Sequence, residues 1–158
     1  MAYATLNPYT GELLKTFPDA TDAEVTQASD NAHAAFLKWK TTSFAQRAAI
    51  LRQAATLLRK GSKSYAELLT IEMGKLFAEA QAEVELSAQI LEYYADNAEA
   101  LLAPEKLPVA KAAEGEAILV HEPLGVLLAI EPWNFPYYQI ARIIAPQLSA
   151  GNTVLLKH

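Results

Sequence analysis

Apolar residues recur at intervals of three and four along most of the first hundred residues, which is the period of an amphipathic helix. This spacing predicts four helices, over residues 22–40, 44–60, 62–73 and 76–102. Capping-box sequences at residues 21–24 and 43–46 precede the first two. Gly61 and Gly74 are positioned to end the second and third, because glycine readily adopts the conformations that close a helix. This part of the chain is therefore expected to be mainly helical.

Two short segments before the helices have the character of strands. Residues 3–6 and 13–17 flank a turn sequence at residues 7–11. Within the turn, Pro8 fixes φ and Gly11 permits a positive φ, as a reversal of the chain requires. The pattern predicts a β-hairpin at the start of the chain.

The hydrophobic period changes after residue 103, where Pro104 and Pro108 end the helical region. A strand is expected at 116–121, and the pattern then predicts a strand, a helix and a strand at residues 126–130, 136–149 and 153–157. The apolar runs in the last two strands are typical of strands buried on both faces of a parallel sheet. Such a succession forms one right-handed βαβ unit. Because two parallel strands need further strands beside them, we expect a truncated α/β domain.

Composition narrows the function. The 158 residues are 52% hydrophobic and 20% charged, as in a soluble globular protein, and the net charge of −5 disfavours binding to nucleic acid or anionic membrane. No apolar run is long enough to cross a bilayer and no leader is evident, so a cytoplasmic location is expected. With no cysteine and three scattered histidines, no metal site is expected. A thiolate nucleophile would have to come from outside these residues.

Candidate chemistry is concentrated at residues 132–136, between the first buried strand and its crossover helix. Ligands bind at the carboxyl ends of parallel strands. The amide of Asn134, near a helix amino-terminus, could stabilise an oxyanion that forms on a carbonyl under attack. The same residue could instead cap the helix, and Trp133 could simply fill the core. The spacing leaves both interpretations open.

A second group follows along the same helix. Phe135, Gln139 and Arg142 stand one, five and eight residues after Asn134, so they project from one face towards one region. The planar guanidinium of Arg142 suits a substrate carboxylate, although the residue could also be an ordinary exposed one. Lys157, at the end of the next strand, could donate to a ribose hydroxyl or phosphate, or could be solvated.

Taken together, several motifs resemble the aldehyde dehydrogenase superfamily in order and spacing. The motifs lie at residues 7–12, 72–75, 122–126, 132–136 and 150–154. The resemblance covers the whole chain but only the first third of a family member. It implies an α/β fold in which residues 1–102 pack on the cofactor domain, 103–124 form an oligomerisation arm, and 125–158 begin a Rossmann-type sheet without the usual glycine-rich turn.

The resemblance also assigns roles. Asn134 matches the oxyanion-hole amide, Ile130 and Trp133 match positions whose backbone lines the cofactor site, and Lys157 matches the lysine that hydrogen-bonds the adenosine ribose. The implied cofactor is NAD or NADP. In the family a cysteine thiolate attacks the aldehyde and a glutamate activates water. Both lie downstream, so these 158 residues alone are expected to be inactive.

Two departures from the common pattern point to a substrate. Many family members have lysine at the position of Ile143, whereas this chain has arginine one residue earlier, at Arg142. Succinate-semialdehyde dehydrogenases are similar in this respect, and their arginine binds the distal carboxylate of the substrate. His158, where most members have proline, is similar to one bacterial branch of that activity. Phe135, Gln139 and Arg142 are therefore expected to bind succinate semialdehyde.

The sequence leaves alternatives for the substrate and for the class of function. Arg142 would fix a carboxylate but not the length of the aldehyde, so glutarate semialdehyde or a general aldehyde is also possible. The resemblance implies a homodimer or homotetramer for a full-length enzyme. An alternative function of a different class is that of a non-catalytic helical interaction module, which would have the helices and the oligomerisation strand but no nucleophile.

Overall fold

The computed structural model describes residues 3–110 and 115–158. The elements follow one another in the order β1 (Tyr3–Leu6), β2 (Leu13–Phe17), α1 (Asp22–Trp39), α2 (Phe44–Lys60), α3 (Ser62–Met73), α4 (Phe77–Leu101), β3 (Glu105–Leu107), β4 (Ala117–Leu119), β5 (Val126–Ile130), α5 (Pro136–Ser149) and β6 (Thr153–Lys157). The predicted hairpin, the four helices and the strand–helix–strand unit are all present. The helix predicted over 76–102 is one residue shorter at each end.

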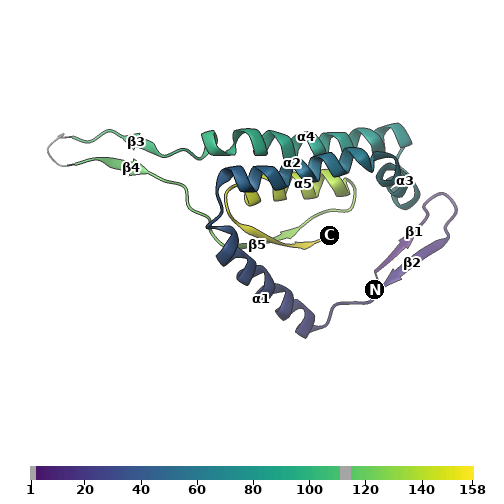
Figure 1. The fold of residues 1–158 in the computed structure, drawn as a ribbon. Helices are drawn as coiled ribbons and strands as arrows, with labels where there is room; N and C mark the ends of the chain where they lie inside the picture. Colours follow the sequence, from purple (N-terminus) through teal and green to yellow (C-terminus); the bar gives the residue numbers. More distant parts are fainter. Residues whose placement is uncertain (1–2, 111–114) are drawn as a thin grey trace.

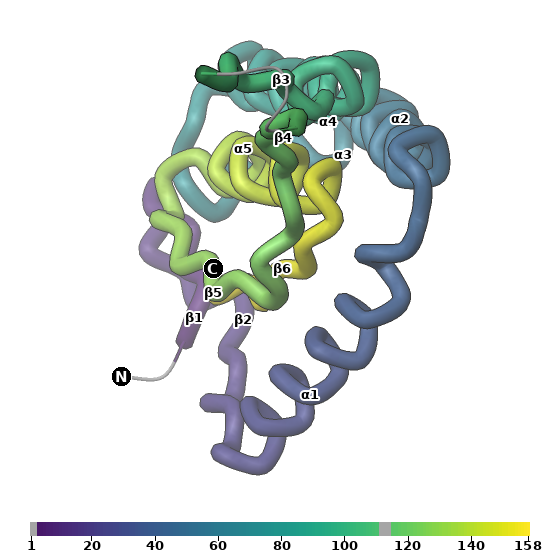
Figure 2. The backbone as a smooth tube through the Cα atoms, turned by 90° about the vertical axis from the view of Figure 1, so that its left-hand side faces the viewer, coloured from purple at the N-terminus to yellow at the C-terminus, as the bar shows by residue number. Residues whose placement is uncertain are grey.

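The elements form layers around α5. Helix α4 packs against α2, α3 and α5, and α5 in turn contacts β6. Figures 1 and 2 show α5 between the upper helices and the β5–β6 sheet, with α1 across the other face of that sheet. The helix that follows the candidate loop at 132–136 is therefore the central element of the molecule.

Local sequence explains where the helices begin and end. Thr21 and Ser43 each accept a bond from the backbone three residues on, and the glutamate or glutamine there bonds back, which completes both predicted capping boxes. Helix α3 ends at Gly74, whose φ of 70° is the left-handed conformation that favours glycine. A Cβ on Gly74 would stand 3.1 Å from the Cγ of Pro8, because the turn between β1 and β2 packs here.

The main core lies where α2, α4 and α5 meet. It consists of the buried residues Leu51, Ala55, Ala88, Leu91 and Ala145. Ala88 and Ala145 are completely buried, and their small side chains let α4 and α5 approach closely. The two leucines, each 2% exposed, fill the space that remains. One side of α5 is therefore packed firmly against α2 and α4.

The parallel pairing of β5 with β6 is in register from Val126 opposite Thr153 to Ile130 opposite Lys157. Asn152 fixes the start of both strands, since its Oδ1 accepts the N–H of Gly125 at 3.0 Å. The Oγ1 of Thr153 donates to the carbonyl of Ala32 at 3.0 Å, which joins α1 to the sheet.

One expectation about these strands is wrong. Both were predicted to be buried on both faces, but Leu128 and Ile130 are 64% and 69% exposed. Ala129, which points to the opposite face, is buried. The reason is that, among the described residues, only β5 and β6 form this sheet, and α1 contacts β6 more extensively than β5. The apolar run therefore predicted the strand correctly but not how deeply its side chains are buried in this chain.

A second hairpin extends away from the body, as Figure 1 shows at β3 and β4. The strands pair antiparallel, with Glu105 opposite Leu119 and Leu107 opposite Ala117. Strand β4 is shorter than the predicted strand at 116–121, and β3 was not predicted because two prolines flank its three residues. Within the residues that the structure describes, no helix is long and apolar enough to cross a membrane.

Candidate functional site

The loop that joins β5 to α5 presents the candidate residues at the carboxyl end of the sheet. Helix α5 begins at Pro136, and its N-cap residue, Phe135, makes no side-chain capping hydrogen bond. The capping interpretation of Asn134 is therefore wrong, and its exposed side chain is available for another role. Trp133 is 72% exposed, so it does not fill the core of this chain either.

Ile130 and Lys157 end the two paired strands, and the register places them side by side. The N–H of Glu131, the first residue of the loop, donates to the carbonyl of Lys157 at 3.0 Å, so the two strand ends stay together. The Lys157 ammonium lies 5.1 Å from the centre of the Tyr3 ring and donates to the carbonyl of His158 at 3.3 Å. The structure thus brings the predicted cofactor residues to one edge.

The predicted substrate residues follow along α5. The guanidinium of Arg142 lies 5.7 Å from the centre of the Tyr138 ring, and this ring meets that of Phe135 edge-on at 6.2 Å. A side chain that leans on the residue four positions earlier points towards the start of its helix, and hence towards Asn134. Gln139 is half-buried, and its N–H donates to the carbonyl of Phe135 at 2.8 Å. Tyr138, which links Phe135 to Arg142, was not predicted.

Two further residues at this site were missed from the sequence. Glu83 of α4 accepts the backbone N–H groups of Tyr137 and Tyr138 at 3.0 and 3.2 Å, and its other carboxylate oxygen bonds Lys75. The ammonium of Lys75 also lies 3.6 Å from the centre of the Phe135 ring. One signal was present: Glu83 falls on the buried stripe of its helix, where a charged residue needs a partner.

Burial also affects a tyrosine at the start of α5. The pKa of Tyr137 is raised, mainly because its hydroxyl is withdrawn from water, and further because Tyr65 and two carboxylates lie near. Its ring lies 5.6 Å from that of Tyr65 on α3. The tyrosine is therefore neutral at physiological pH and serves to pack α5 on α3.

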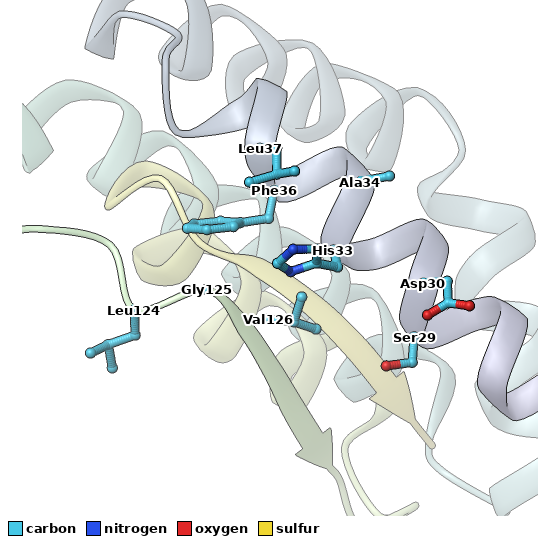
Figure 3. A pocket seen from close by; sticks show the side chains of 9 residues that line it. All are labelled: Ser29, Asp30, His33, Ala34, Phe36, Leu37, Leu124, Gly125 and Val126. Carbon is cyan, nitrogen blue, oxygen red and sulfur yellow. The ribbon is translucent and has the colours of Figure 1, made fainter.

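A hollow of about 740 Å³ lies at the other end of the sheet, between α1 and the start of β5 (Figure 3). Phe36, Leu124 and Val126 supply apolar walls, and His33 and Asp30 are among its polar residues. Ligands bind at the carboxyl ends of parallel strands, whereas this hollow adjoins the amino end of β5. We therefore assign it no part in the site.

Comparison with known proteins supplies the family. The sequence profile described as "Aldehyde dehydrogenase family" matches residues 1–158. The chain is 49% identical over 156 residues to the succinate-semialdehyde dehydrogenase [NADP(+)] of Deinococcus radiodurans, covering 99% of this chain and 32% of that protein. It is also 49% identical over 158 residues to succinate-semialdehyde dehydrogenase [NADP(+)] 1 of Mycobacterium tuberculosis, covering 100% of this chain and 35% of that one.

A solved structure agrees. The succinic semialdehyde dehydrogenase of Streptococcus pyogenes, crystallised with NADP+, superposes with a TM-score of 0.93 and 45% identity, covering 99% of this chain and 34% of that chain. The chain spans about a third of the length of the curated relatives that it matches. Because the family profile and the relatives cover it from end to end, the chain belongs to the aldehyde dehydrogenase family.

Proposed function

We propose that these residues are part of an NADP+-dependent dehydrogenase that oxidises succinate semialdehyde to succinate. The reaction replaces the aldehyde hydrogen with an oxygen from water, and NADP+, when bound, accepts the hydride. The chain has no cysteine, so the thiolate that the family uses as nucleophile lies outside these residues. This chain contributes residues that surround the reacting carbonyl and bind the substrate and the cofactor.

Asn134 contributes the oxyanion donor. When a thiolate attacks an aldehyde, the carbonyl oxygen becomes negative and needs a hydrogen-bond donor already in place. The amide of Asn134 is exposed, stands at the carboxyl end of β5, and is not used to cap α5. The amino-terminus of α5 lies immediately after it and adds a favourable partial positive charge.

Arg142 contributes the substrate preference, and its orientation is the observation that carries the proposal. Arg142 stands seven positions after Phe135, a helical rise of roughly 10 Å, which is more than a four-carbon substrate alone can span. The side chain shortens this separation because it leans back over Tyr138 towards the loop. Arg142 is exposed and forms none of the ion pairs among the described residues, so its guanidinium is available for a carboxylate.

The edge formed by Ile130 and Lys157 contributes to the cofactor site. An exposed apolar residue beside a cation at the carboxyl end of two parallel strands fits a dinucleotide, which needs a surface for its rings and a donor for its ribose. Trp133 extends the same edge. We choose NADP+ over NAD+ because the two relatives at 49% identity carry NADP(+) in their names.

The test is Arg142→Ala in the full-length enzyme, assayed with succinate semialdehyde and with butanal, which has the same carbon chain but no carboxylate. Loss of a charge-assisted bond to the carboxylate should raise KM for succinate semialdehyde by roughly tenfold to a hundredfold. KM for butanal should change by less than about twofold. Glutarate semialdehyde, one carbon longer, serves as the third substrate.

Arg52→Ala is the matched control, because Arg52 is also an exposed helical arginine but pairs with Asp96 far from the loop. Equal changes in KM for succinate semialdehyde and butanal would refute the carboxylate role. If the parent enzyme had a higher kcat/KM for glutarate semialdehyde, the proposed substrate would change, but the role of Arg142 in binding the carboxylate would stand. The cytoplasmic location, the homodimeric or homotetrameric state and the division into 1–102, 103–124 and 125–158 stay predictions.

A further inference from the structure

The start of α5 is held by a carboxylate from another helix. In the first turn of a helix, backbone N–H groups have no acceptor of their own, and a serine, threonine or aspartate just before the helix usually supplies one. Phe135 occupies that position and cannot do so. Instead, one oxygen of Glu83 accepts both the Tyr137 and the Tyr138 N–H, at 3.0 and 3.2 Å, from a position 54 residues earlier in the chain.

This arrangement is a costly way to cap a helix. The side chain of Glu83 is only 1% exposed, and a buried carboxylate is destabilising unless it is paired and hydrogen-bonded. Lys75, whose side chain is 11% exposed, pairs with the second oxygen of Glu83. A local cap at position 135 would have satisfied the same N–H groups without burying two charges. Stability alone therefore does not explain the pair.

The benefit lies in the loop. A cap supplied from α4 leaves the amide of Asn134 and the ring of Phe135 free of that duty. It also joins the loop to the helical layer at two points, since Lys75, in the connection between α3 and α4, lies against the Phe135 ring and Glu83 is anchored in α4. Lys75 further balances the negative charge that Glu83 brings close to a place where an oxyanion would form.

We infer that Glu83, held by Lys75, is a positioning residue: it fixes the first turn of α5 and so sets the position from which Asn134 reaches the reacting carbonyl. The inference rests on the proposed function. Because its side chain is almost completely buried, Glu83 acts through the loop at residues 131–135 and not by direct contact with a ligand. A shift of about 1 Å in a catalytic donor can lower the rate by up to a hundredfold. The buried charges of Glu83 and Lys75 therefore serve to keep Asn134 in position.

The test uses full-length enzyme with Glu83→Ala and with Glu83→Asp, which keeps a carboxylate but withdraws it from α5 by one methylene. Both should lower kcat for succinate semialdehyde by about tenfold or more, with less than a threefold change in KM for NADP+. Glu85→Ala is the control, because Glu85 lies on the same helix but faces Arg59 at the surface. Its kcat should stay within about twofold of the parent.

Two readouts separate positioning from general stabilisation. In an Asn134→Ala background, Glu83→Asp should change kcat by less than about threefold, because its effect passes through the missing amide. Hydrogen exchange should find the Tyr137 and Tyr138 amides protected in the parent and in Glu85→Ala, and exposed in both Glu83 variants. This second readout needs no catalysis, so it stands even if Asn134→Ala were to show that the oxyanion role is wrong.

Three results would overturn the inference. The first is a folded Glu83→Asp enzyme whose kcat equals that of the parent. The second is a loss of activity that is as large without Asn134 as with it. The third is unchanged exchange at the two tyrosine amides. Should Glu83→Ala fail to fold, Glu83→Asp alone decides among these outcomes, because it keeps the buried charge and its lysine partner.

Discussion

Replacing Asn134 by alanine distinguishes most directly between a catalytic and a structural role of the loop. Loss of one oxyanion donor costs about 2.7–4 kcal/mol of transition-state stabilisation, a fall in kcat of roughly a hundredfold to a thousandfold. The side chain is exposed and does not cap α5, so the free energy of unfolding should change by no more than about 0.5 kcal/mol. Activity should therefore be lost without loss of stability.

A helix-capping asparagine would behave in the opposite way. Its replacement by alanine costs about 1 kcal/mol of stability and leaves the chemical step nearly unchanged. The measurement is kcat with saturating succinate semialdehyde and NADP+ in the full-length enzyme, together with Tm in the absence of ligands. Asn97→Ala is the control, because Asn97 is an exposed helical asparagine whose amide bonds the carbonyl of Tyr93 on α4.

A kcat within about twofold of the parent would refute the oxyanion role. So would a fall in kcat that follows a fall in Tm, because the loss could then be explained by unfolding. A rise in KM alone would mean that Asn134 binds substrate and transition state equally, and that the developing charge is stabilised elsewhere.

Two further predictions concern stability. Leu91→Ala should cost about 3–5 kcal/mol, in the upper part of the range for buried leucines, because its alanine neighbours cannot move to fill the cavity. Leu86→Ala, 44% exposed on the same helix, should cost less than about 1 kcal/mol; equal losses in urea unfolding would contradict this core. Arg59 lowers the pKa of Glu85 and Glu92 from 4.5, so its contribution is present above about pH 5 and is lost as the pH falls through the lowered values. The Tm difference between parent and Arg59→Gln should accordingly shrink between pH 7 and pH 3. A constant difference would show that Arg59 does not stabilise the fold through Glu85 and Glu92.

Elements whose causes lie within a few neighbouring residues were predictable from the sequence. Helix α5 and strands β5 and β6 have the predicted bounds, because an apolar period, a proline at the helix start and a glycine after its end all act locally. The same holds for both capping boxes. The loop that carries Asn134 could be located for this reason, since it is what remains between a clear strand and a clear helix.

Features that depend on a distant partner were not predictable. Strand β3 has three residues between two prolines, and only its pairing with β4 makes it a strand. The exposure of Leu128 and Ile130 depends on how many strands lie beside them, which the apolar pattern does not report. Glu83 bonds residues 54 positions away, and its helical stripe signals burial but not the identity of its partner. In each case the missing information concerns tertiary contacts.

Helix α5 explains why the proposed site can be held accurately by so few residues. Asn134 precedes its first turn and Arg142 lies on its second, so one rigid element sets the distance between the oxyanion donor and the carboxylate anchor. Glu83 holds the start of that element, whereas Leu91 and the neighbouring alanines hold its flank. A displacement of the start should move Asn134 alone and lower kcat. A displacement of the flank should move Asn134 and Arg142 together, so the Leu91→Ala enzyme should show changes in both kcat and KM for succinate semialdehyde.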